Sequence, residues 1–246
     1  MSVVELAQEI EASVYRSWKA RVCVEYDGWQ LRFADGFSRR GNSVYPESLS
    51  SLPHGEKLDW CRDWYAQRGL DLVVRQTIAS EPGLDEVLDA AGFGQEGRTH
   101  VMTRDVVGRG GSLAAASAPT SSWWRTTADL WGFDLERSDG WSAIINRIDL
   151  PAAFIAIDGK AAGLAIVDGS WVGLFEIIVA PEIRRSGLGR EVTESLLAWG
   201  AERGAQRSYL QVVAENTTAI DFYQGLGFEH TYSYWYRRDQ PANRPA

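Results

Sequence analysis

Apolar residues at the start of the chain recur with the spacing of an amphipathic helix. Leu6 and Ile10 lie four residues apart on one face, and Ser2 with Glu5 has the S-x-x-E spacing of a capping box. The sequence therefore predicts a helix over residues 2–18.

Short apolar runs then predict strands. VCVEY and WQLRFA are separated by Asp27-Gly28, and NSVYP follows Asp35-Gly36, and such dipeptides favour hairpin turns. Beyond them LDWCRDWYAQRG is typical of a helix, DLVVRQTI of a strand, GLDEVLDAAGF of a short helix and THVMTRDV of a strand. The predicted order is helix, three strands, helix, strand, helix, strand.

The segment GRGGSLAAASAPTSS is rich in Gly, Ala and Ser, and it predicts a linker without a fixed shape. After it the same order returns, with strands FIAID, AAGLAIV and LFEIIVAP, a helix from about Leu188 to Gly204, the strand SYLQVVA, a helix ending in GLGF and the strand TYSYWYRR. We expect domains at residues 1–107 and 123–246, joined by a linker at residues 108–122.

A constant offset of 135 relates the two halves. Residues 44–93 and 179–228 align without a gap and share 13 identities, among them Gly92 with Gly227. Self-similarity at a fixed period indicates duplicated structure.

Composition narrows the classes of function. The chain of 246 residues has 33 acidic and 25 basic residues and a net charge of -8, so nucleic acid is not an expected partner. No apolar run reaches the roughly 18 residues of a membrane span, and acidic residues occupy the N-terminal segment where a secretion signal is basic and apolar. We therefore expect a cytoplasmic protein with no membrane partner. Two cysteines and three scattered histidines favour neither a disulfide framework nor a metal site.

The stretch VAPEIRRSGLGR, residues 179–190, has the features of an anion-binding turn. Gly187 and Gly189 allow close approach of a ligand to the backbone, and the first turn of the following helix offers unpaired N–H groups. A pyrophosphate fits this pattern. A tight turn between a strand and a helix, without a ligand, is the alternative.

These features occur together with Asn216 after the strand SYLQVVA and with Tyr223 four residues before Gly227. The combination resembles the GNAT superfamily of acyl-CoA-dependent N-acetyltransferases, over about residues 150–238. The resemblance implies an α/β (α+β) chain of two tandem domains of this type, each with a mixed, mostly antiparallel central sheet flanked by helices.

The resemblance also implies acetyl-CoA as the cosubstrate, with no metal. Backbone N–H groups of residues 185–190 would hold the pyrophosphate, main-chain groups of residues 177–179 would pair with the pantetheine arm, and Asn216 would contact that arm. Tyr223 would act as the general acid for the leaving thiolate. The implied cofactor-binding set is Ile177, Ile178, Val179, Arg184, Arg185, Ser186, Gly187, Leu188, Gly189, Arg190, Asn216 and Tyr223.

The general base is less directly indicated. Some members of the superfamily place a glutamate where this chain has Gln211, which is not basic. Glu176, in LFEIIVAP, is the remaining acid on the central strands and is the candidate base. A role in orienting the substrate, or in pairing with an arginine, is the alternative.

The first half resembles the same fold without the chemistry. At the offset of 135, the arginine and two glycines of the turn correspond to Leu49, Leu52 and His54, and Asn216 corresponds to Glu81. We therefore expect one working site, in the second half, and an internal pseudo-dimer that is a monomer in solution. The first half would support or close the substrate side of that site.

Arg39, Arg40 and Asn42 follow a predicted hairpin in the first half. They are candidates to line the acceptor pocket and to bind a carboxylate or phosphate of the substrate, and a solvated edge is the alternative. Three tryptophans at the start of the second half are expected in core or inter-domain packing, with a substrate cage as the alternative: Trp123, Trp124 and Trp131.

The resulting hypothesis is an acetyl-CoA-dependent N-acetyltransferase that acts on a primary amine, of a small molecule or a peptide, by direct attack in a ternary complex. Two alternatives remain open. One is a non-catalytic acyl-CoA-binding or regulatory protein, and the other is a structural or partner-binding module.

Overall fold

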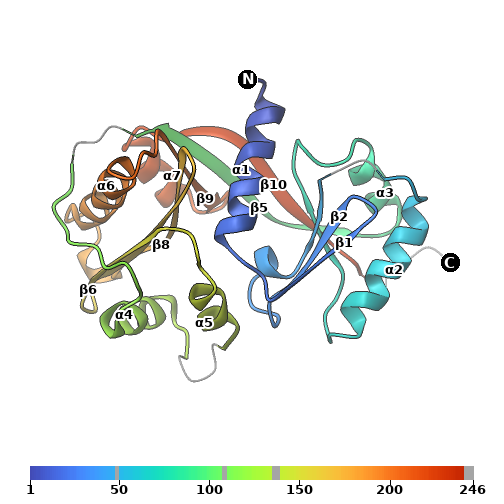
Figure 1. Cartoon of the computed structure of the whole chain (residues 1–246), viewed down its shortest axis with the longest axis horizontal. Coiled ribbons are helices and arrows are strands. Elements are labelled where there is room, and N and C mark those ends of the chain that lie inside the picture. Colours follow the sequence, from blue (N-terminus) through green and yellow to red (C-terminus); the bar gives the residue numbers. More distant parts are fainter. Residues whose placement is uncertain (48–49, 107–109, 135–138, 241–246) are drawn as a thin grey trace.

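A computed structural model describes residues 1–47, 50–106, 110–134 and 139–240, and its strands form one ten-stranded sheet (Figure 1). The strand order is β1-β2-β3-β4-β10-β5-β9-β8-β7-β6, and most neighbouring strands are antiparallel. The strands are β1 (Val22–Tyr26), β2 (Trp29–Phe33), β3 (Val44–Pro46), β4 (Val73–Gln76), β5 (Gly94–Asp105), β6 (Ala152–Ile157), β7 (Ala161–Asp168), β8 (Trp171–Val179), β9 (Arg207–Val213) and β10 (Glu229–Arg238).

Helices cover both faces of this sheet. They are α1 (Val3–Ser17), α2 (His54–Ala66), α3 (Leu84–Ala90), α4 (Ser121–Trp131), α5 (Asp139–Asn146), α6 (Leu188–Ala201) and α7 (Thr217–Gln224), with 3-10 turns η1 (Arg39–Gly41) and η3 (Pro181–Ile183). The predicted capping box at Ser2 and Glu5 is confirmed, with both reciprocal hydrogen bonds present. The sequence did not indicate α4 and α5, which are amphipathic helices packed on the second half.

The two halves are joined through their last strands. β5 follows the elements of the first half but pairs with β9, and β10, the last strand of the chain, pairs with β4. β5 and β10 also pair with each other, and Figure 1 shows these two long strands crossing the middle of the molecule. The two sheets expected from the sequence are therefore one continuous sheet. The first residues of β5 and β10, Gly94 and Glu229, differ by 229 − 94 = 135.

The described part of the predicted linker has a defined course along the second half. Ala116 exchanges two backbone hydrogen bonds with Phe154 of β6, and the Leu113 N–H donates to Ser195 Oγ of α6 at 3.1 Å. A Cβ at Gly111 would lie 2.2 Å from the Ser195 nitrogen. The expectation of no fixed shape is wrong for these residues, because the small residues let the backbone itself pack and bond. Residues 107–109 lie outside the described residues.

The core has three clusters of buried side chains. One lies between the sheet and helices α2 and α3, another between the sheet and helices α6 and α7, and the largest includes α1, α4 and α5 together with strand residues of both halves. Within the described ranges, no helix is both long and apolar enough to cross a membrane.

A buried ion pair fixes α1 to the centre of the sheet. The Arg75 guanidinium of β4 donates two hydrogen bonds of 2.8 Å to the Glu11 carboxylate of α1, and the Tyr232 hydroxyl of β10 donates a third at 2.7 Å. Arg75 is fully buried and Glu11 nearly so. The pair therefore connects three elements from both ends of the chain.

Replacement of Arg75 by methionine should lower the free energy of unfolding by about 3–5 kcal/mol, because the Glu11 charge is left buried without a partner. The Glu11→Leu/Arg75→Met double variant should recover most of this loss. Urea unfolding measures both values. The control is Arg16→Met, which breaks the pair at the protein surface between Arg16 of α1 and Asp168 of β7 and should cost about 1 kcal/mol or less. Equal losses for Arg75→Met and Arg16→Met would contradict this account.

Candidate functional site

The candidate site lies where two parallel strands part. β8 and β9 pair only from Trp171 with Arg207 to Leu174 with Leu210, although β8 continues to Val179. Beyond Leu174, β8 keeps its pairing with β7 and has no partner on its other edge among the described residues. A cavity of about 450 Å³ opens at this point, and residues of both halves line it. The free edge can accept an extended chain as an added strand.

A β-bulge directs Glu176 into this cavity. Between the pairs Ala162–Ile178 and Leu164–Phe175, two residues of β8 face the single residue Gly163 of β7. Glu176 has φ +52°, in the left-handed region that non-glycine residues rarely adopt. Gly163 is required here, because a Cβ would lie 2.8 Å from Val192 of α6. The bulge explains how a glutamate in an apolar strand reaches the cavity.

The surroundings of Glu176 change its acidity. Burial raises the pKa of the Glu176 carboxyl to about 7, and the Arg40 charge and the Trp131 side chain oppose this rise. At neutral pH the carboxyl group therefore exchanges a proton readily, as a general base must. Trp131 lines the cavity as well, whereas Trp123 is fully buried in the core.

Tyr223 and Asn216 reach the same cavity from α7. Burial raises the pKa of the Tyr223 hydroxyl to about 12, so the group stays protonated at neutral pH. It makes no hydrogen bond within the described residues, and its ring packs against Phe228. Asn216 caps α7, since its side-chain oxygen accepts from the Ala219 N–H at 3.1 Å. Gln211 of β9 also lines the cavity, and its buried amide nitrogen has no hydrogen-bond partner.

The predicted anion-binding turn follows β8 directly and begins α6. Gly187 is the N-cap residue with φ +91°, and Arg185 also has a positive φ of +63°. The first intrahelical bond is from the Glu191 N–H to the Gly187 carbonyl, which leaves the N–H groups of residues 188–190 free, as at any helix start. A Cβ at Gly189 would lie 3.3 Å from Phe222, so a larger residue would press on that ring.

The three candidate substrate-binding residues of the first half, Arg39, Arg40 and Asn42, do not all lie at the cavity. Arg39 and Arg40 both line the cavity, so the first half contributes two cationic side chains to it. Asn42 does not line it. Its amide accepts from the Ala34 N–H at 2.8 Å and donates to the Phe37 carbonyl at 2.7 Å, so it holds the loop that presents η1. The expected substrate contact of Asn42 is therefore corrected to a structural role.

In the first half, carboxylate side chains from other loops occupy the corresponding turn. The Asp27 carboxylate accepts from the Ser51 and Leu52 N–H groups, both at 2.9 Å. Glu81 accepts from the Ser50 N–H at 3.1 Å. Burial acts to raise the pKa of the Glu81 carboxyl, but hydrogen bonds from Ser50, Trp29 and His54 lower it to about 2. Two carboxylates thus occupy the N–H groups of residues 50–52, which correspond to residues 185–187 of the second-half turn. Leu49 lies outside the described residues.

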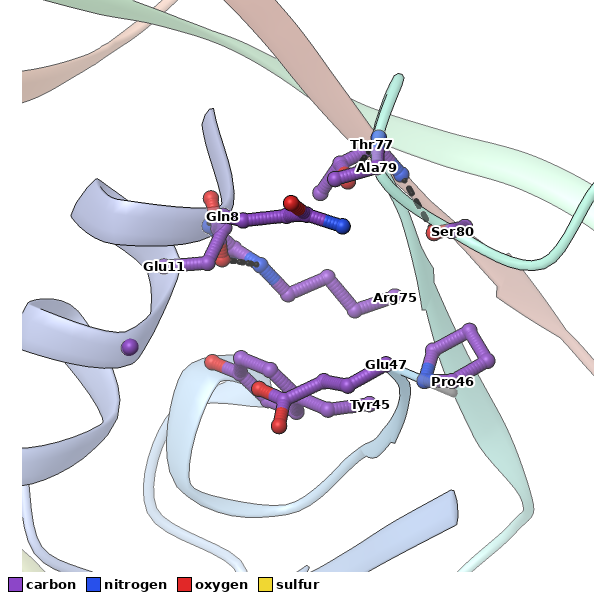
Figure 2. Close-up of a pocket in the computed structure, with 10 residues that line it drawn as sticks. Gln8, Glu11, Tyr45, Pro46, Glu47, Arg75, Thr77, Ala79 and Ser80 are labelled. Carbon is purple, nitrogen blue, oxygen red and sulfur yellow. Dashed lines mark hydrogen bonds and ion pairs between the residues drawn. The ribbon is translucent and has the colours of Figure 1, made fainter. Parts of the chain in front are cut away.

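A second cavity, of about 250 Å³, lies between α1 and the ends of β3 and β4 (Figure 2). Figure 2 shows the Arg75 side chain reaching to Glu11, with Gln8 on one side of it and Tyr45 and Glu47 on the other. Because the Glu11 carboxylate accepts two hydrogen bonds from Arg75, the guanidinium that lines this cavity is already paired.

Sequence reasoning missed several aromatic residues of the main cavity. Trp18 comes from the end of α1, and Tyr234 and Tyr236 come from β10. Alternate tyrosines in TYSYWYRR indicate one face of a strand, but nothing in the pattern indicates that this strand lies between β4 and β5. For the described residues, no group of three or more His, Cys, Asp or Glu side chains could hold a metal ion.

Comparison with known proteins places this geometry in a family. Residues 8–237 match the family described as the C-terminal region of the probable histone acetyltransferase Rv0428c. The chain is 29% identical over 242 residues to the uncharacterized N-acetyltransferase YobR of Bacillus subtilis, covering 94% of this chain and 97% of that protein. It is 31% identical over 229 residues to the probable histone acetyltransferase Rv0428c of Mycobacterium tuberculosis, covering 89% of this chain and 69% of that protein.

The fold has a similar match among solved structures. A GCN5-related N-acetyltransferase from Kribbella flavida superimposes with a TM-score of 0.68 at 17% identity, covering 95% of each chain. At that identity the likeness concerns the fold.

Proposed function

This chain belongs to the family described as the C-terminal region of the probable histone acetyltransferase Rv0428c, within the GNAT superfamily of N-acetyltransferases, and we propose that it transfers an acetyl group from acetyl-CoA to a primary amine. One observation carries the proposal. The free edge of β8 leads directly into the glycine turn at the start of α6, and the cavity beside that edge contains a carboxyl group and a phenol.

The residues present fit acetyl-CoA. The free N–H groups of the turn, with the positive end of the α6 dipole, would hold the pyrophosphate. Arg184, Arg185 and Arg190 add positive charge around it. Main-chain groups of residues 177–179 would pair with the pantetheine arm in the gap between β8 and β9, and Asn216 lies at the same cavity.

When bound, acetyl-CoA supplies the acetyl group as an activated thioester. The chain positions the amine beside it, which supplies a large part of the rate enhancement. Glu176 accepts the proton that the amine loses, and its raised pKa suits this task near neutral pH. The Tyr223 hydroxyl donates a proton to the departing sulfur.

We also infer that the chain is a duplicated pair of domains in which the first has lost its cofactor site. The proposed domains are residues 1–107 and 123–246, with the linker at 108–122. The element order and the offset of 135 support the duplication, and the carboxylates of Asp27 and Glu81 in the first-half turn support the loss.

The competing function is a non-catalytic acyl-CoA-binding protein. Calorimetric titration with acetyl-CoA and an assay of free-thiol release, run on the same preparation with a panel of small amines and lysine peptides, separate the two. Thiol release that depends on the amine supports the transferase. Binding without release on any amine supports the alternative, and absence of binding rejects both.

One acetyl-CoA should bind per chain, because the Asp27 and Glu81 carboxylates occupy N–H groups of the first-half turn, and Leu52 and His54 stand there in place of Gly187 and Gly189. Gly187→Glu should abolish binding, since a carboxylate would enter the pyrophosphate site in a residue that needs a positive φ. Calorimetry gives the stoichiometry. The matched control is Leu52→Glu, at the corresponding position of the first half, which should leave the affinity unchanged. Two equivalents per chain would refute the single-site assignment.

Tyr223→Phe should lower kcat by roughly 10- to 1000-fold, because the ring packing is kept and only the proton donor is lost. The affinity for acetyl-CoA should stay the same. Tyr26→Phe, at a ring that stacks on Trp60 away from the cavity, is the control. An unchanged kcat for Tyr223→Phe would mean that another group supplies the proton.

A further inference from the structure

Arg40 and Glu176 carry opposite charges into the same cavity from the two halves of the chain. The Arg40 guanidinium carbon lies 5.7 Å from the ring centre of Phe175, the residue before Glu176, but no ion pair within 4.0 Å or hydrogen bond joins Arg40 and Glu176 among the described residues. The Arg40 Nε atom is buried without a hydrogen-bond partner. Each charge is therefore available to a group that enters the space between them.

The other cationic side chains near the two cavities are already paired. Arg39, beside Arg40, lies 3.3 Å from the Glu96 carboxylate. Arg75, in the cavity of Figure 2, gives two hydrogen bonds to Glu11. Arg40 is only partly exposed and its Nε atom is buried without a partner, so an anionic group of a ligand would stabilise this guanidinium in the cavity.

The walls around Arg40 define the rest of that ligand. Its guanidinium carbon lies 5.0 Å from the Trp18 ring centre and 5.7 Å from that of Phe175, and these rings hold it in place. Phe37, Trp131 and Phe133 add further apolar surface to the same cavity. An apolar body therefore fits beside the charged groups.

We propose that the acceptor is a free α-amino acid with an apolar side chain, bound through its carboxylate to Arg40 and with its amino group at Glu176. This inference rests on the proposed function and names the substrate class. An α-amino acid carries both charges on one carbon, so it can bridge two side chains that are close but unpaired. A single unpaired guanidinium suits a carboxylate, with one negative charge, better than a phosphate dianion.

The transfer step balances with these groups. The amino nitrogen forms a C–N bond with the acetyl carbon as the C–S bond of the thioester breaks. Glu176 first takes one proton from the bound ammonium group, which makes the nitrogen nucleophilic. The nitrogen loses its second proton to solvent as the amide forms, and Tyr223 gives one proton to the sulfur and regains one from solvent. The products are an N-acetylamino acid and CoA with a free thiol.

A matched series of acceptors tests the carboxylate directly. L-phenylalanine, L-phenylalaninamide and 2-phenylethylamine share the amine and the ring, and only the first has a carboxylate. Phenylalanine should have a kcat/KM about 100-fold above the other two, because they leave the Arg40 charge unpaired. In Arg40→Gln that advantage should fall to about threefold or less, and unchanged circular dichroism and acetyl-CoA affinity would show that the variant is folded. Arg21→Gln, which removes an equal charge from an exposed pair, should keep the full advantage.

Binding gives a second readout that does not depend on turnover. Calorimetric titration of phenylalanine into the protein saturated with CoA should show binding that Arg40→Gln weakens and Arg21→Gln does not. Equal use or equal binding of phenylalanine and its amide by the wild type would overturn the proposal, as would preferred transfer to a lysine peptide. Those outcomes would leave the proposed acetyl transfer intact, whereas absence of thiol release with every amine would reject the transfer itself.

Discussion

The site depends on the point at which β8 separates from β9. Strand pairing ends at Leu174 and Leu210, and the bulge opposite Gly163 turns β8 away from its neighbour. This one interruption of the sheet opens the cavity, frees a strand edge and aims Glu176 inward. The glycine turn at the start of α6 follows the end of the same strand. Cavity, edge and turn are therefore consequences of a single local break in hydrogen bonding.

The exchange of β5 and β10 makes the first half part of that site. Because β10 lies between β4 and β5, Tyr234 and Tyr236 reach a cavity whose other wall is β8. The Glu11–Arg75 pair holds α1 against this junction, and Trp18 at the end of α1 packs beside Arg40. The first half, in which the Asp27 and Glu81 carboxylates occupy the corresponding turn, thus supplies the remaining walls and one charge.

Local features could be predicted from the sequence, and features set by distant contacts could not. The capping box of α1 and the glycine turn at residue 187 depend only on residues close in the sequence, so the local sequence was enough to predict them. The strand exchange could not be predicted, because hydrophobic periodicity fixes the face of a strand and not its neighbours. The prediction that Asn42 contacts the substrate was wrong for a related reason. Its amide bonds lie within a loop whose shape no pattern encodes, and no pattern indicates that Arg40 has no ion-pair partner within 4.0 Å among the described residues.

The pH dependence of kcat/KM for wild type and Glu176→Gln tests most directly whether the opening between β8 and β9 creates a general base. Glu176 must lose its proton to work, so wild-type kcat/KM should rise with pH and bend near 7, where burial has placed the pKa of this carboxyl. In the glutamine variant the rate should be lower, and the bend should move up toward the pKa of the amine itself. A bend near 7 that persists in the variant, with only the acceptor KM raised, would contradict the account.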